Sequence, residues 1–199
     1  MKRYYLQTVL CTMLSLSSVA FAYDGFEKYA QSYADTHGVT IVEAKRALNI
    51  EMHKDDIMEQ IISNYHDRLA GVYIDHVPSY TIVVRLLGDG CDKTQFFQLA
   101  NGLPNQTVPV RFVYGAKITQ DAAALQIDAV KSVASKYLTG VQMISYNPMT
   151  GKIDIEVNGE NTPEMQSKIA QLQDAWQNTS VDLNVILVSF TIKPMLEMQ

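Results

Sequence analysis

The chain has 199 residues, of which 16 are Lys or Arg and 21 are Asp or Glu, so its formal net charge at pH 7 is −5. Affinity for nucleic acid comes mostly from basic contacts to phosphate, so this acidic balance argues against a nucleic-acid partner. The length suits one ordinary domain or two small ones.

The N-terminal segment has the three features of a cleavable signal peptide. Lys2 and Arg3 form a positive n-region, the stretch from Leu6 to Val19 is mostly apolar, and Ala20-Phe21-Ala22 provides a small-x-small cleavage site. The apolar stretch is shorter than the roughly 20 residues that a membrane-spanning helix needs. We therefore expect residues 1–22 to be removed, no integral membrane segment in the mature chain, and a periplasmic or secreted protein.

Cleavage would change both the charge and the cysteine content. The mature chain would keep 14 basic residues against 21 acidic ones, a net charge of −7, because Lys2 and Arg3 leave with the signal. Only Cys91 would remain of the two cysteines, which excludes an intramolecular disulfide and leaves packing to stabilise the fold. Cys11 lies early in the apolar stretch and follows large residues, which argues against a lipoprotein.

Helical patterns come first in the mature chain. A helix is indicated over residues 26–33, and a stronger pattern predicts one helix or two successive helices over residues 40–69. Thr40 and Glu43 have the spacing of a capping box, in which each side chain satisfies a backbone donor of the first turn. Gly71 is expected to end this helical region.

A β-hairpin is predicted next, because the period of the apolar residues changes from 3.6 to 2. Residues 72–74 and 81–84 are β-branched and aromatic and flank a turn at Pro78. A short helix is predicted over residues 93–100, followed by a linker at residues 101–105.

The second half repeats this order with stronger signals. Its predicted elements are a strand at 108–114, a helix at 119–138, hairpin strands at 141–146 and 152–157, a helix at 162–177 and a strand at 181–191. Strand, helix, strand, strand, helix, strand is the order of a ferredoxin-like unit. We predict an α+β protein of helices packed on antiparallel sheets, with an N-terminal helical and hairpin unit at residues 23–104 and a ferredoxin-like (βαββαβ) unit at 105–199.

The two halves also resemble each other. Gly71 and Pro78 mark the first hairpin, and Gly140 and Pro148 mark the second, at an offset of about 70 residues. This spacing predicts two related helix-hairpin units.

No arrangement of side chains indicates catalysis or metal binding. His37, His53, His66 and His76 do not form an H-E-x-x-H motif, and there is no G-x-S-x-G turn and no phosphate-binding glycine loop. Asp75 precedes His76 on a strand, where neighbouring side chains point to opposite faces. We expect no enzymatic activity, no cofactor and no metal; a hydrolase would become an alternative if His53, His66 or His76 lay near a carboxylate in a cleft.

Unpaired sheet edges are the alternative source of function. The strands at 108–114 and 181–191 are long and apolar, and an exposed edge can take up a strand from a partner through main-chain hydrogen bonds. Whether other parts of the chain cover these edges is left open by the sequence.

Residues 38–87 resemble a known family. The segments 38–48, 69–76 and 81–86, with Tyr73 where the family has Trp, are similar to the N-terminal part of the pro-regions of bacterial trypsin-like serine proteases of the α-lytic protease and streptogrisin type. The resemblance implies an α+β segment that helps its protease to fold. It also implies inhibition of that protease by sheet pairing and by insertion of a C-terminal tail into the active-site cleft.

The sequence up to Gln199 contains no catalytic His, Asp and Ser motifs of such a protease, so we expect a stand-alone relative. The resemblance implies a protein partner, which is either an exported serine protease that the chain inhibits or helps to fold, or another exported protein. A relative that has kept only the fold is the remaining alternative. The implied contact residues on the last strand and tail are Val185, Leu187, Ser189, Thr191, Pro194, Met195, Leu196 and Met198. The alternative is an envelope-associated or ligand-binding module with an enclosed apolar pocket between its halves.

Overall fold

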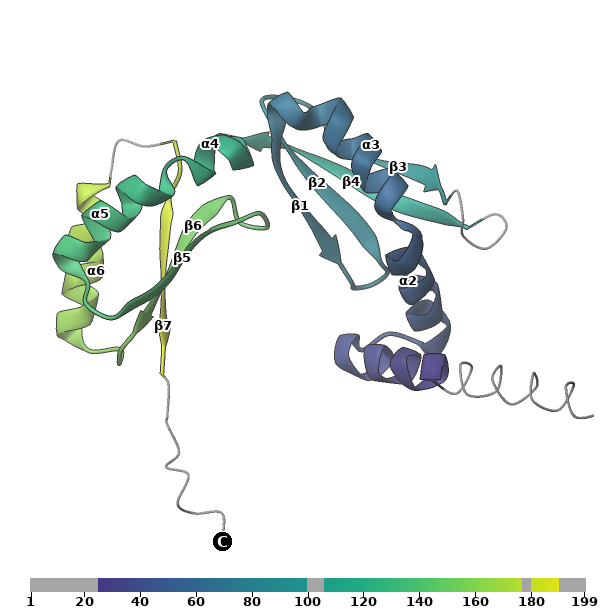
Figure 1. The fold of residues 1–199 in the computed structure, drawn as a ribbon, viewed down its shortest axis with the longest axis horizontal. Coiled ribbons are helices and arrows are strands. Elements are labelled where there is room, and N and C mark those ends of the chain that lie inside the picture. The colour runs from purple at the N-terminus through teal and green to yellow at the C-terminus, as the bar shows by residue number, and fades with distance from the viewer. Residues whose placement is uncertain (1–24, 100–105, 177–179, 190–199) are drawn as a thin grey trace, which may run out of the picture. The chain divides into compact units, whose positions relative to one another are not determined.

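The computed structural model describes residues 25–99, 106–176 and 180–189, which form helices and two mixed β-sheets (Figure 1). The predicted α+β class is confirmed. A helix over residues 25–37 is followed by α2 (Ile41–His53), α3 (Asp55–Tyr65), the single turn η1 (His66–Arg68), β1 (Leu69–Asp75), β2 (Thr81–Leu87), β3 (Lys93–Gln98), β4 (Thr107–Ala116), α4 (Gln120–Ala124), α5 (Ile127–Tyr137), β5 (Val141–Asn147), β6 (Lys152–Asn158), α6 (Pro163–Ala175) and β7 (Leu183–Val188). No helix in the described ranges is long and apolar enough to cross a membrane.

The chain forms two compact units, each built from several separate segments of the sequence. The first unit comprises the residues up to Glu59 together with Ile74–Thr81 and Phe96–Pro109. The second unit comprises Gln60–Tyr73, Ile82–Gln95 and the chain from Val110 onward. The boundary that we predicted between residues 104 and 105 lies outside the described residues.

Helix α2 has one half of its predicted capping box, because the Glu43 carboxylate accepts the backbone N–H of Tyr80 and pairs with Arg46. The Thr40 hydroxyl accepts the backbone N–H of Glu43 at 3.2 Å at the start of α2. Lys54 separates α2 from α3, so the predicted helical region is two helices. The prediction that Gly71 ends the helix is wrong, because Gly71 lies inside the strand β1, whose first three residues are buried, and α3 has already ended at Tyr65.

Gly71 instead allows another part of the second unit to approach β1. A Cβ atom at this position would lie 2.7 Å from the Cβ of Pro148 in the β5–β6 turn. Nearby, the Arg85 Nη1 donates to the Pro148 carbonyl at 3.1 Å, and the Tyr146 hydroxyl donates to the Ala70 carbonyl at 2.7 Å. Burial raises the pKa of Tyr146 although Arg85 acts to lower it, so the hydroxyl keeps the proton that it donates.

The larger sheet has the strand order β1-β2-β4-β3, and β2 pairs with β4 in parallel. We predicted antiparallel sheets, and the parallel pairing corrects that prediction. Val110 and Phe112 of β4 are fully buried beside Ile82 and Val84 of β2, so the apolar side chains of β4 are buried in this sheet. The second half thus has the predicted order of elements, but its first strand does not join a four-stranded ferredoxin-like sheet with β5, β6 and β7.

The helix predicted over residues 93–100 is also wrong, because residues 93–98 form β3 at the edge of this sheet. Thr94, Phe96 and Phe97 favour a strand, and β4 supplies the hydrogen-bonding partner that the local sequence could not reveal.

The smaller sheet has the order β5-β6-β7, with β5 antiparallel and β7 parallel to the central β6. Helices α5 and α6 cover one face of it (Figure 1). Ile153, Ile155 and Val157 of β6 are fully buried against Leu172 of α6 and Val130 of α5. Alternation along the strand is typical of a sheet with one face in the core.

Both sheets share one local arrangement. In each sheet the second of two consecutive neighbouring strands, β2 or β6, also pairs in parallel with a later strand, which is β4 in the larger sheet and β7 in the smaller one. The predicted relation between two helix-hairpin units stays a prediction.

Candidate protein-binding surface

The predicted contact strand, β7, lies at one edge of the smaller sheet. It pairs with β6 from Ile153 opposite Leu183 to Asn158 opposite Val188, and no strand of the described chain lies on its other side.

The predicted contact residues of β7 do not all face outward. Val185 and Leu187 are half-buried and pack against the core, so β7 would offer a partner mainly its backbone at these positions. Ser189 is exposed. The remaining predicted contacts, Thr191, Pro194, Met195, Leu196 and Met198, lie outside the described residues.

The opposite edge of the same sheet is β5, which the sequence analysis did not single out. One side of β5 pairs with β6, and no strand in the part of the chain that the structure describes lies along the other. The pairing shifts between Val141 and Met143, so Gln142 is an extra, bulged residue. From Met143 to Asn147 the pairing is regular, and alternate residues of such a strand direct their N–H and C=O groups away from its neighbour.

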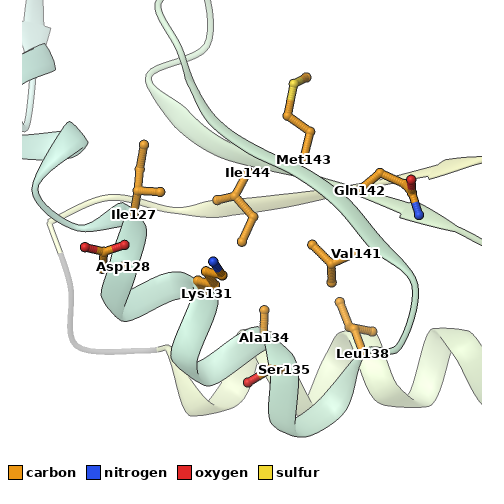
Figure 2. A pocket seen from close by; sticks show the side chains of 10 residues that line it. All are labelled: Ile127, Asp128, Lys131, Ala134, Ser135, Leu138, Val141, Gln142, Met143 and Ile144. Atoms are coloured by element: carbon orange, nitrogen blue, oxygen red, sulfur yellow. The ribbon is translucent and has the colours of Figure 1, made fainter.

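A groove of about 490 Å³ lies between β5 and α5 (Figure 2). Its lining residues are Ile127, Asp128, Lys131, Ala134, Ser135, Leu138, Val141, Gln142, Met143 and Ile144. Val141 and Ile144 extend from β5 toward α5 in Figure 2, whereas Met143 extends away from that helix. Ala134 and Leu138 are buried at the base of the groove.

Helical spacing explains why α5 presents this wall. Ile127, Lys131, Ala134 and Leu138 follow one another at intervals of three or four residues and so lie on one side of the helix. Asp128 on the neighbouring row places a carboxylate beside the lysine, so the polar rim carries both signs of charge. The groove is therefore mainly apolar at its base and has no strong charge preference.

A polar row on the other face of the sheet ties both edges to the central strand. The Asp154 carboxylate of β6 accepts the side-chain amides of Asn147 on β5 at 2.7 Å and of Asn184 on β7 at 2.8 Å. Asp154 is only 8 % exposed. These two hydrogen bonds oppose sliding of β5 and β7 along β6.

The histidines that could have indicated hydrolytic chemistry have other partners. His53 Nδ1 lies 2.8 Å from the Asn49 carbonyl within α2, and His76 Nδ1 lies 2.6 Å from the Tyr33 hydroxyl. His66 lies 2.8 Å from the Asp67 carboxylate, but these side chains are 68 % and 85 % exposed, so the pair lies on the surface. The described residues contain no group of three or more His, Cys, Asp or Glu side chains placed to hold a metal ion.

Comparison with protein-family models and with curated proteins finds no match to this chain. The similarity of residues 38–87 to protease pro-regions therefore stays a prediction. In the structure these residues contain α2, α3, β1 and β2.

Proposed function

We propose that this chain is an exported, non-enzymatic protein-binding module that adds an extended segment of its partner to the β5 edge. The observation that supports this most directly is the regular edge from Met143 to Asn147 beside the apolar α5–β5 groove.

Strand addition would use both features at once. The backbone groups along the outer side of β5 would pair with the added strand, and every second side chain of that strand would point toward α5 and enter the groove. Because Asp128 and Lys131 both line the rim, the alternating positions of the bound segment are expected to be apolar rather than charged.

An exported serine protease is the partner that we propose, on the basis of the resemblance of residues 38–87 to protease pro-regions. Such pro-regions act through sheet pairing, and the smaller sheet has two edges, β5 and β7, at which a strand could be added. The chain would act as a stand-alone inhibitor or folding helper of that protease.

A matched pair of serine variants on α5 tests the groove. Ser135 is exposed and lines the groove, whereas Ser132 is exposed on the same helix and is outside the lining. Ser135→Trp should fill the groove and exclude one partner side chain, whose burial is worth about 1.5–3 kcal/mol, so binding should weaken roughly tenfold or more. Ser132→Trp should bind as the natural chain does.

The partner would be captured from the native exported fraction with the chain from residue 23 onward and identified by mass spectrometry. Its affinity for both variants would then be measured by calorimetry, and inhibition would be measured if it is a protease. Equal affinity of the natural chain and both variants would refute binding in the groove. Removal of residues 193–199 tests the predicted tail separately, since inhibition should weaken if the tail enters the protease cleft.

A second candidate function is binding of a small apolar ligand. The groove volume of about 490 Å³ lies in the range of small-molecule sites, which is about 300–1,000 Å³. Native mass spectrometry of the purified protein would detect such a ligand, and its displacement by Ser135→Trp but not by Ser132→Trp would favour this alternative.

A further inference from the structure

Four aromatic rings join the helix over residues 25–37 to the end of β1 and the turn after it. The Tyr33 hydroxyl lies 2.6 Å from His76 Nδ1. The rings of His37 and His76 stack with their centroids 4.1 Å apart and an interplanar angle of 22°. Tyr80 meets the His76 ring edge-on at 6.0 Å.

The rest of the contact that holds this helix is small. Its buried apolar part consists of Ala30 and Ala34 of the helix against Ala44 of α2, with a few partly buried side chains around them. A salt bridge of 2.6 Å joins Glu27 to Lys45, and both side chains are about one-third exposed. Exposed salt bridges contribute little, and elements with few buried apolar contacts open more easily than a core. The stacked imidazoles are therefore a substantial part of what holds the helix.

The protonation of the stacked pair matters because two imidazolium ions at this separation repel each other. Negative groups oppose that repulsion: Glu51 on α2 and Asp75 on β1 both favour a charged His76. The Glu51 carboxylate, however, is shared with the Lys54 ammonium and the Tyr80 hydroxyl. Two further groups face the cluster, and neither offsets the repulsion. Glu43, also on α2, already pairs with the Arg46 guanidinium, and the Tyr33 phenol of the helix is neutral.

We propose that this cluster is a pH-sensitive latch: the helix over residues 25–37 stays docked while His37 and His76 are not both protonated, and it detaches when both are. Burial, together with the neighbouring His37, holds the pKa of His76 below its ordinary value of 6.5. The docked state thus binds fewer protons than the detached state. Docking is fully favoured above pH 6.5 and is lost as the pH falls below that value. This inference is independent of the proposed binding function, since every residue in it belongs to the first unit.

Hydrogen exchange measured by mass spectrometry tests the latch on the chain from residue 23 onward. After correction for intrinsic exchange, amides in residues 25–37 should lose protection between pH 7.5 and pH 5.0, by roughly tenfold for each unit by which the histidine pKa differs between docked and detached states. Amides of α5 should not change, because that helix lies in the second unit.

Three glutamine variants separate a latch from a merely structural contact. His37→Gln removes one of the two cations, so it should reduce the pH dependence of protection to the part that burial of His76 causes, even if it lowers protection at both pH values. His76→Gln removes the buried imidazole together with the charge pair and should abolish the pH dependence. His66→Gln, whose natural side chain is exposed, should keep the full pH dependence.

Equal protection of the natural chain at both pH values would overturn the latch, as would retention of the full pH dependence by His37→Gln or its loss in His66→Gln. A proton NMR titration provides a second measurement that does not depend on the variants. The His76 ring signals should titrate at a lower pH than those of a free imidazole, and a titration at the free value would contradict the proposal.

Discussion

Replacing Asp154 by Ala is the sharpest test of how the smaller sheet holds its two edges. The substitution removes the carboxylate that accepts the side-chain amides of Asn147 and Asn184, at a site that is 8 % exposed. A hydrogen bond to a charged group contributes about 1.5–3 kcal/mol, but two bonds that share one carboxylate do not add fully. We expect Asp154→Ala to lower the free energy of unfolding by about 2–4 kcal/mol.

The assay can be confined to the relevant core. Trp176 is the single tryptophan of the chain and is buried in the core below this sheet, so urea unfolding followed by its fluorescence reports on that core. Asp154→Asn keeps one acceptor oxygen and should lose about half as much stability as the alanine variant. Lys152→Ala, an exposed position on the same strand, should change stability by no more than about 0.5 kcal/mol. A loss below about 0.5 kcal/mol for Asp154→Ala would refute the view that the polar row fixes the edges.

Two further changes give predictions of their own. Gly71→Ala would place a Cβ 2.7 Å from Pro148, and we expect a loss of about 1–3 kcal/mol by the same fluorescence assay; an unchanged stability would mean that the turn moves aside freely. Burial acts to raise the pKa of Glu51, but hydrogen bonds from Lys54 and Tyr80 hold it below 4.5. The native state therefore gains stability from Glu51 above pH 4.5 and loses it as the pH falls, so Glu51→Gln should flatten acid unfolding of the first unit between pH 5 and 3, measured by hydrogen exchange. A curve as steep as that of the natural chain would contradict this assignment.

Elements that depend on local signals could be predicted from the sequence. The hydroxyl of Thr162 accepts the N–H of Met165, with Pro163 at the first helical position, and α6 begins where these residues indicate. Both hairpins were likewise predicted from β-branched residues around a proline turn.

Elements that depend on distant partners could not be predicted. Residues 93–98 have an ambiguous local pattern, and they form a strand because β4 lies beside them. The predicted strand at 108–114 was correct, but its sheet was not, since strand order is decided by which apolar faces meet after the chain has folded. The β5 edge could not be predicted for the same reason. Helix α6 connects β6 to β7 by a parallel crossover, which places β7 beside β6 and leaves β5 at the opposite edge of the sheet.

The candidate sites show this limit most clearly. His37 and His76 are far apart in the sequence, and nothing in their spacing indicates that their rings stack. The groove lies between a helix and the strand that follows it, and both elements were predicted from the sequence. The sequence did not indicate that a groove would remain between them.

The interleaving of the two units has a consequence for how the molecule could be inherited or dissected. The chain leaves the first unit at Glu59 and returns to it twice, at Ile74–Thr81 and at Phe96–Pro109. A gene fragment that stops before Thr107 would also omit β4, the strand between β2 and β3. Neither unit can therefore be exchanged, duplicated or produced by a single cut of the chain.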